Sequence, residues 1–146
     1  MITITVDTSQ LDKTLSDFPA RLAAAQRRAL QAIGAAVASR TTQAFRTPAF
    51  RPSPWAPRKD KKSTHPLLIK SGNLRQSINW KLDGDDAVAV GAPMKYASYH
   101  QEGTKNMPAR PFFPIDGDGN LTPAMAEKIS RTVERIYVDE LEKLGG

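Results

Sequence analysis

The chain has 146 residues, a length that suits a single domain around one hydrophobic core. It contains no cysteine, which excludes disulfides and thiolate metal sites and fits a reducing compartment without requiring one. The net charge of +6 favours polyanionic surroundings, whereas no apolar run approaches the roughly 20 residues of a membrane helix. The N-terminus also lacks the basic start and apolar core of a signal peptide. We therefore expect one domain over residues 1–146, with no membrane partner.

The first third of the chain predicts a strand followed by helices. Residues 2–6 alternate between apolar and threonine side chains, which is typical of a half-buried strand. Residues 8–18 then space their apolar side chains as a helix does, and Pro19 predicts a break after Phe18. The helical spacing resumes over residues 20–45, which we expect to form one long helix.

This long helix is the first unusual feature. At 1.5 Å per residue it would measure about 39 Å, more than the roughly 30 Å width of a small domain. Such a helix must protrude or pack against something beyond its own core. Its middle, residues 32–39 (AIGAAVAS), consists almost entirely of small residues that permit another backbone to approach closely. The simplest interpretation is an alanine-rich helix that lies on its own sheet, and an external partner is the alternative.

Residues 46–66 show no periodicity and are rich in proline and in basic side chains. An irregular segment of this length is usually functional or disordered, so we expect an extended or mobile arm. Trp55 is costly to leave in water, and we expect it to be anchored on the body or on a partner. The arm is either a solvated basic linker or a contact for DNA or an acidic protein. The residues available for such a contact are Arg46, Arg51, Trp55, Arg58, Lys59, Lys61 and Lys62.

The middle of the chain predicts a short helix and a hairpin. Ser71 is placed to cap a helix that runs through Leu74 to Ile78. Residues 78–82 and 87–90 then flank the sequence DGDD, which predicts a β-hairpin with an Asp-Gly turn.

The last third predicts a turn or short helix over residues 93–101, an extended segment over residues 109–115 and a closing helix. Thr122 and Pro123 suit the N-cap and the first position of that helix. Its expected apolar face comprises Met125, Ile129, Val133, Ile136, Tyr137, Leu141 and Leu144. The order of elements predicts an α+β fold: a small antiparallel β-sheet packed against a long N-terminal helix and a C-terminal helix, with a long basic Pro-rich loop.

His100 and Glu102 are the residues that most resemble an active site. No cysteine or second histidine stands at ligand spacing, and no nucleophile elbow, phosphate loop or zinc motif occurs in the chain. As a general base His100 would have only Ser98, Tyr96 or Glu102 as partners. Hydrogen bonding within a turn explains the histidine better, so we expect no catalytic residue and no cofactor.

The sequence DGDGN, residues 116–120, partly matches a calcium loop. Asp116, Asp118 and Asn120 occupy its positions 1, 3 and 5, and Glu127 occupies position 12. Leu121 stands where the loop needs glycine at position 6. We therefore expect a polar turn before the last helix rather than a metal site.

Several short motifs occur together in a fixed order. They are SPWAP at residues 53–57, LLIKSGNLRQSI at 67–78, VAVGA at 88–92, YASYHQEGT at 96–104 and MPARPFF at 107–113. Together they resemble the virion morphogenesis (tail completion) family of Mu-like and P2-like tailed phages. Two departures are Glu102, where a large apolar residue is common, and the short link before PARPF. The matching motif residues include Leu68, Ser71, Gly72, Leu74, Ser77, Val90, Gly91, Tyr96, Ala97, His100, Gln101, Gly103, Pro108, Ala109, Arg110, Pro111 and Phe112.

The resemblance implies a non-enzymatic structural protein of a tailed phage. It would form a six-fold ring at the head–tail junction, or neck, that completes the tail and joins it to the head connector. The implied partners are further copies of the chain, connector or adaptor proteins, the tail tube protein and the passing genomic DNA. The implied location is the virion, after assembly in the host cytoplasm. The alternative is a small basic DNA-binding protein that uses residues 46–66.

Under this resemblance the motif residues take structural roles. Glycines at positions 72 and 103 permit turns that other residues disfavour. Tyr96 and Phe112 would fill the core beside the sheet. His100 and Gln101 would hydrogen-bond backbone groups of the loop over residues 103–110 and hold Arg110. Arg110 would then pair with an acidic group such as Asp116, or with a neighbouring subunit.

Overall fold

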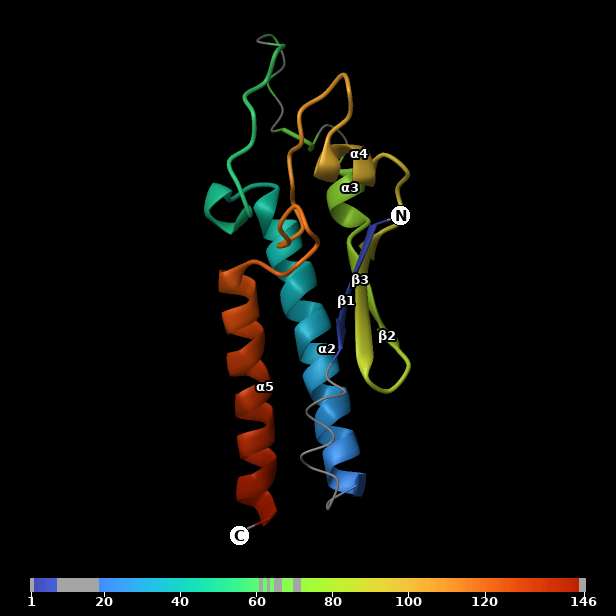
Figure 1. The fold of residues 1–146 in the computed structure, drawn as a ribbon, viewed down its shortest axis with the longest axis vertical. Coiled ribbons are helices and arrows are strands. Elements are labelled where there is room, and N and C mark those ends of the chain that lie inside the picture. The colour runs from blue at the N-terminus through green and yellow to red at the C-terminus, as the bar shows by residue number, and fades with distance from the viewer. Residues whose placement is uncertain are drawn as a thin grey trace.

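Helix α5, helix α2 and a three-stranded sheet lie side by side as three layers (Figure 1). The computed structural model describes residues 2–7, 19–60, 62, 64, 67–69 and 72–144. The elements are β1 (Ile2–Asp7), α2 (Pro19–Ala44), the 3₁₀ helix η1 (Pro48–Phe50), α3 (Asn73–Gln76), β2 (Asn79–Asp83), β3 (Ala87–Ala92), α4 (Ala97–Glu102) and α5 (Pro123–Leu144). The predicted α+β fold is confirmed. The helix predicted over residues 8–18 lies outside the described residues, and the single-domain assignment stays a prediction.

The sheet has the order β1-β3-β2, with both pairs antiparallel. The hairpin forms as predicted: Asp83 pairs with Ala87, and Gly84 takes the positive φ of 69° that the turn requires. Strand β3 lies between the two other strands, and all six of its residues are buried. The predicted alternation along residues 87–90 therefore produces no exposed face there.

Helix α2 lies directly on the sheet, as its small residues predicted. A Cβ atom added at Gly34 would come 2.7 Å from the Trp80 ring and 2.9 Å from Val88, so only glycine permits this approach. Ile33 and Val37 flank the contact and are fully buried in the main core. This packing removes apolar surface from water along the C-terminal half of α2. The burial of that surface is the main term that stabilises the body.

The N-terminal half of α2 packs against α5. This contact explains how a helix longer than the sheet is covered. Leu22, Ala25 and Ala29 form a second apolar cluster with Tyr137 of α5. Both helices continue beyond the hairpin turn in Figure 1, so α5 covers the part of α2 that the sheet does not reach. Helix α5 therefore provides the packing partner that the long helix requires.

An ion-pair cluster joins the same two helices. The Glu140 carboxylate, only 8 % exposed, lies 3.2 Å from Arg21 and 2.9 Å from Arg28 of α2. The hydrogen bond from Arg28 and the charges of the nearby basic residues hold the pKa of Glu140 below its usual range, although burial opposes the shift.

The segment before α5 is a polar turn, as predicted. The Asp116 carboxylate accepts hydrogen bonds from the backbone N–H groups of Asp118 and Asn120 at 2.9 and 3.0 Å. The Thr122 hydroxyl accepts from the backbone N–H of Met125 at 3.4 Å, which is the predicted cap of the closing helix. Among the described residues no group of three or more His, Cys, Asp or Glu side chains is arranged to hold a metal ion.

Candidate assembly site at the base of the arm

The arm begins where α2 ends, and Arg51 folds back onto that end. Its guanidinium donates to the carbonyls of Ala44 at 2.6 Å and Phe45 at 3.2 Å. The last carbonyls of a helix lack intrahelical partners, and a cation there also complements the helix dipole. Burial lowers the pKa of Arg51. Arg51 was a candidate for DNA or partner contact, but its guanidinium is engaged within its own chain.

Trp55 fixes the next turn of the arm to the body. Its indole Nε1 donates to the carbonyl of Pro111 at 2.7 Å, and the Arg51 guanidinium lies 3.6 Å from its ring centroid. The indole also meets the ring of Phe45 edge-on, and Phe45 in turn contacts Phe112 in the core. The predicted anchoring of Trp55 is confirmed, and the anchor is the body itself.

Arg110 makes the second link between the arm and the body. Its guanidinium donates to the carbonyls of Ala56 at 3.0 Å and Pro57 at 3.1 Å, while its backbone N–H donates to the carbonyl of His100 at 2.7 Å. No ion pair of Arg110 occurs among the described residues, so the predicted pairing with Asp116 is wrong, whereas the alternative pairing with a neighbouring subunit stays a prediction. A guanidinium with several donors satisfies two backbone carbonyls of the arm instead. We call Arg51, Trp55 and Arg110, with the carbonyls they bind, the arm clamp.

Gln101 positions the body's side of this clamp. Its side chain is only 8 % exposed, and its Oε1 accepts from the backbone N–H groups of Phe112 and Phe113 at 2.9 and 3.0 Å. The prediction that Gln101 binds backbone groups is confirmed, but these groups lie just after the predicted loop. Both phenylalanines are fully buried, as predicted for Phe112. At Gly103 φ is 79°, and an added Cβ would lie 2.8 Å from the backbone nitrogen of Ala109.

Two predictions on α4 are wrong. Tyr96 does not fill the core: it is 37 % exposed and meets His100 edge-on at 5.8 Å between ring centroids. The His100 side chain makes no hydrogen bond to the described residues, and its Nδ1 is buried without a partner there. It is the backbone carbonyl of His100 that holds Arg110. Burial, and then the charge of Arg110, lower the pKa of His100, so the neutral imidazole is favoured.

The Ser-Gly motif supports the same end of the molecule. Gly72 stands at the N-cap position of α3, with φ of 76°. Ser71, which was predicted to cap this helix, lies outside the described residues, so its capping role stays a prediction. Leu74 is buried in the main core, and the Ser77 hydroxyl donates to the Leu74 carbonyl at 2.7 Å.

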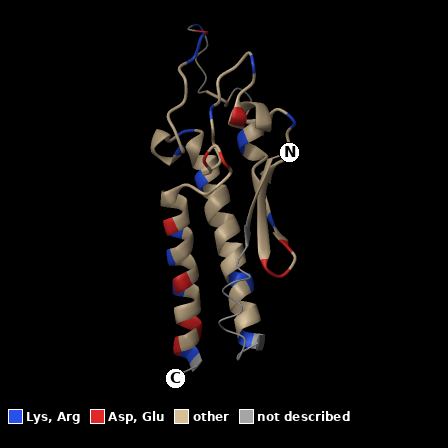
Figure 2. Cartoon of the chain, in the orientation of Figure 1, with Lys and Arg blue, Asp and Glu red and all other residues tan. Residues whose placement is uncertain are grey.

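Beyond the clamp the arm is basic and runs beside a second loop. A hollow of about 600 Å³ is lined by residues 56–59 of the arm and 104–108 of the loop after α4. Lys59 and Lys105 line this hollow and are exposed; the sequence did not indicate Lys105, because one lysine in a turn carries no pattern. Lys62 is also exposed, farther along the arm. Figure 2 shows basic residues near this end and acidic ones around the β2–β3 turn. Arg46 is exposed nearer the body, and Lys61 lies outside the described residues.

The comparisons with known proteins place the chain in a family. The model of the phage virion morphogenesis family matches residues 6–136, nearly the whole chain. The chain therefore belongs to the phage virion morphogenesis family, and the resemblance seen in the motifs is confirmed. Neither the comparison with curated proteins nor the comparison with solved structures gave a match. In the described part of the chain, no helix has the length and apolarity needed to cross a bilayer.

Proposed function

We propose that this chain is a non-enzymatic structural subunit of a tailed phage, which forms a six-fold ring at the head–tail junction. The ring completes the tail and joins it to the head connector. The observation that supports this proposal most directly is the arm clamp. Trp55 and Arg110 bind backbone carbonyls of segments more than 50 residues away in sequence. The motif residues are thus used to present a basic arm in a fixed direction, as a subunit that contacts its neighbours requires.

The same residues argue against a catalytic role. The His100 side chain makes no hydrogen bond to the described residues, and Glu102, its apparent partner in the sequence, is exposed. A general base requires an orienting partner and a substrate proton within hydrogen-bond reach. The side chains of Gln101 and Arg110 bind backbone groups, as expected of residues in a structural motif.

The experiment is to stop expression of the chain in the phage that encodes it. We expect filled heads and finished tail tubes that do not join, with joining restored when the chain is supplied from a plasmid. Electron microscopy of the purified chain should show rings, and antibody labelling should place it at the neck. Normal joining without the chain would contradict the proposal.

A second candidate function is binding of DNA by the arm. It is favoured by the hollow between the arm and the loop after α4, which is lined by Arg58 and by the exposed Lys59 and Lys105. A site of this kind binds phosphates without reading sequence, so its affinity must fall steeply with salt. Titration of duplex DNA at several salt concentrations tests it: a stable monomer that binds DNA with nanomolar affinity would favour this candidate over the ring.

A further inference from the structure

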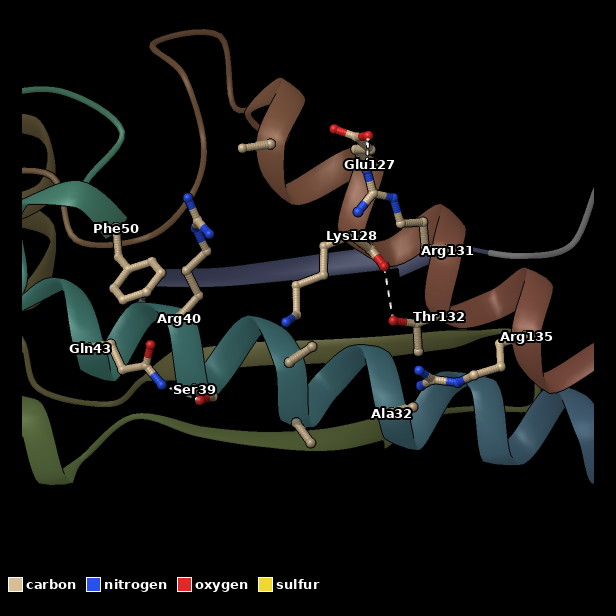
Figure 3. Close-up of a pocket in the computed structure, with 13 residues that line it drawn as sticks. Ala32, Ser39, Arg40, Gln43, Phe50, Glu127, Lys128, Arg131, Thr132 and Arg135 are labelled. Atoms are coloured by element: carbon tan, nitrogen blue, oxygen red, sulfur yellow. Dashed lines mark hydrogen bonds and ion pairs between the residues drawn. The ribbon is translucent and has the colours of Figure 1, made fainter.

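A groove runs between α2 and α5 (Figure 3). It encloses about 740 Å³, and its floor is formed by small residues of α2: Ala32, Ala35, Ala36 and Ser39. The side chains along it are basic, namely Arg40 from α2 and Lys128, Arg131 and Arg135 from α5, with Glu127 as the only acidic lining residue. The ring of Phe50 closes one end, beneath the Arg40 guanidinium at 5.0 Å. The groove is therefore apolar at its floor and positively charged at its rim.

Most of these cations lack an acidic partner in the described part of the chain. Only Arg131 is paired, with Glu127 one turn away on the same helix. Arg40, Lys128 and Arg135 make no ion pair there, and the Arg40 Nε is buried without a hydrogen-bond acceptor. Figure 3 shows Lys128 and Arg135 extending from α5 toward α2. A buried donor without an acceptor is costly, so the groove is suited to a ligand that supplies carboxylates.

The chain itself carries a surface of complementary character. Val138 and Leu141 of α5 are 42 % and 48 % exposed, two of the four large exposed hydrophobics among the described residues. Glu134 and Glu142, both exposed, lie on the same face, because the four residues recur at i, i+4, i+7 and i+8. We call these four residues the α5 stripe. It combines apolar side chains with carboxylates, as a helix that binds in a basic groove does.

We propose that the groove between α2 and α5 receives the α5 stripe of a second copy of this chain. The dimensions agree: the floor from Ala32 to Ser39 and on to Gln43 extends about 17 Å, and the stripe about 12 Å, at 1.5 Å per residue. The small floor residues let the incoming helix approach, and the basic rim pairs with Glu134 and Glu142. Because groove and stripe are different residues, the contact is heterologous and repeats from copy to copy, and it forms the proposed ring when the rotation between copies closes. This inference rests on the proposed ring and names its interface.

The test uses two charge-reversed chains. The first carries Lys128→Glu with Arg135→Glu in the groove, and the second carries Glu134→Lys with Glu142→Lys in the stripe. Each alone should associate at least tenfold more weakly than wild type in analytical ultracentrifugation. Mixed in equal amounts they should assemble again, because each reversed groove then meets a reversed stripe. Recovery on mixing also shows that both variants fold.

The matched control for the stripe variant is Asp83→Lys, at the end of β2, with Asp86→Lys, in the turn that follows it. It makes the same change in charge as the stripe variant, but at exposed acidic positions outside the stripe. It should therefore leave association unchanged. If the wild type forms rings and the groove and stripe variants assemble equally well, the interface is wrong and the ring proposal stands. If the groove variant assembles normally but loses affinity for duplex DNA, the groove binds nucleic acid and the interface is again wrong. A wild-type chain that stays monomeric and is absent from the neck would overturn both proposals.

Discussion

The body of the molecule and the arm clamp are held together by different kinds of contact. In the body, α2 lies on the sheet through apolar side chains and one glycine, and burial of area is the stabilising term. In the clamp, single side chains bind single backbone groups of distant segments. Apolar packing loses stability in proportion to the volume changed, whereas a lost hydrogen-bond partner leaves a buried polar group unsatisfied. The two regions should therefore respond differently to small substitutions.

The largest effect is expected at Gln101, where the two regions meet. Gln101→Leu keeps the size of the side chain but leaves the buried N–H groups of Phe112 and Phe113 without an acceptor. At about 1–3 kcal/mol for each of the two unsatisfied groups, the free energy of unfolding should fall by about 2–6 kcal/mol, measured by denaturant titration. Gln101→Glu retains an acceptor oxygen and should lose less. Equal losses in the two variants would show that the contact is packing, as in the body.

A smaller effect is expected at Gly34, which tests the body alone. Alanine favours helix by about 1 kcal/mol over glycine, so Gly34→Ala would stabilise an open helix face. Here the new methyl group meets Trp80 at 2.7 Å, and we expect a net loss of about 1–2 kcal/mol. In a chain that already carries Trp80→Ala and Val88→Ala, which removes both close contacts, the same substitution should become stabilising. A gain in the wild-type background would mean that α2 can shift away from the sheet at little cost.

The body was predictable from the sequence because its contacts leave a periodic trace. Apolar spacing predicted the strand at residues 2–6, the long helix and the hairpin. The spacing is regular because it reflects which face of an element is buried. The cost of leaving an indole in water also predicted that Trp55 is anchored. The carbonyl that it binds, at Pro111, had no signal, because a hydrogen bond between residues 56 positions apart leaves no local pattern.

The errors at Tyr96, His100 and Arg110 have the same origin. Helix α4 has only six residues, too short for periodicity to show which side is buried, and Gln101 rather than Tyr96 faces inward. A side chain that binds backbone carbonyls can use any residue as its partner, so residue types did not reveal Ala56 as the acceptor for Arg110. The groove was missed because it belongs to neither helix alone: α2 supplies its floor and α5 most of its rim.

An effect confined to the arm is expected from Trp55→Phe. Phenylalanine retains an aromatic ring but removes the donor to Pro111, which should destabilise the attachment of the arm by about 1 kcal/mol. The body should keep its free energy of unfolding, because the arm opens locally. Hydrogen exchange over residues 51–60 should accelerate about fivefold, whereas Trp80→Phe should leave exchange in that segment unchanged. Global unfolding at the same rate as local opening would mean that arm and body form one cooperative unit.

The smallest effect is expected from the titration of His100 beside the clamp. Burial and the charge of Arg110 lower its pKa, whereas in the unfolded chain the pKa is about 6.5. The folded state thus binds fewer protons, and this contribution to stability is complete above pH 6.5. It is lost as the pH falls from about 6.5 toward the lowered pKa of the folded state. Unfolding titrations at pH 7.5, 6.5 and 5.5 should show a smaller loss in His100→Gln than in wild type. The chain has only one other histidine, so His65→Gln is the control for the removal of one imidazole. If only His65→Gln flattened the profile, the clamp would be insensitive to protonation, and its stability would depend on backbone carbonyls alone.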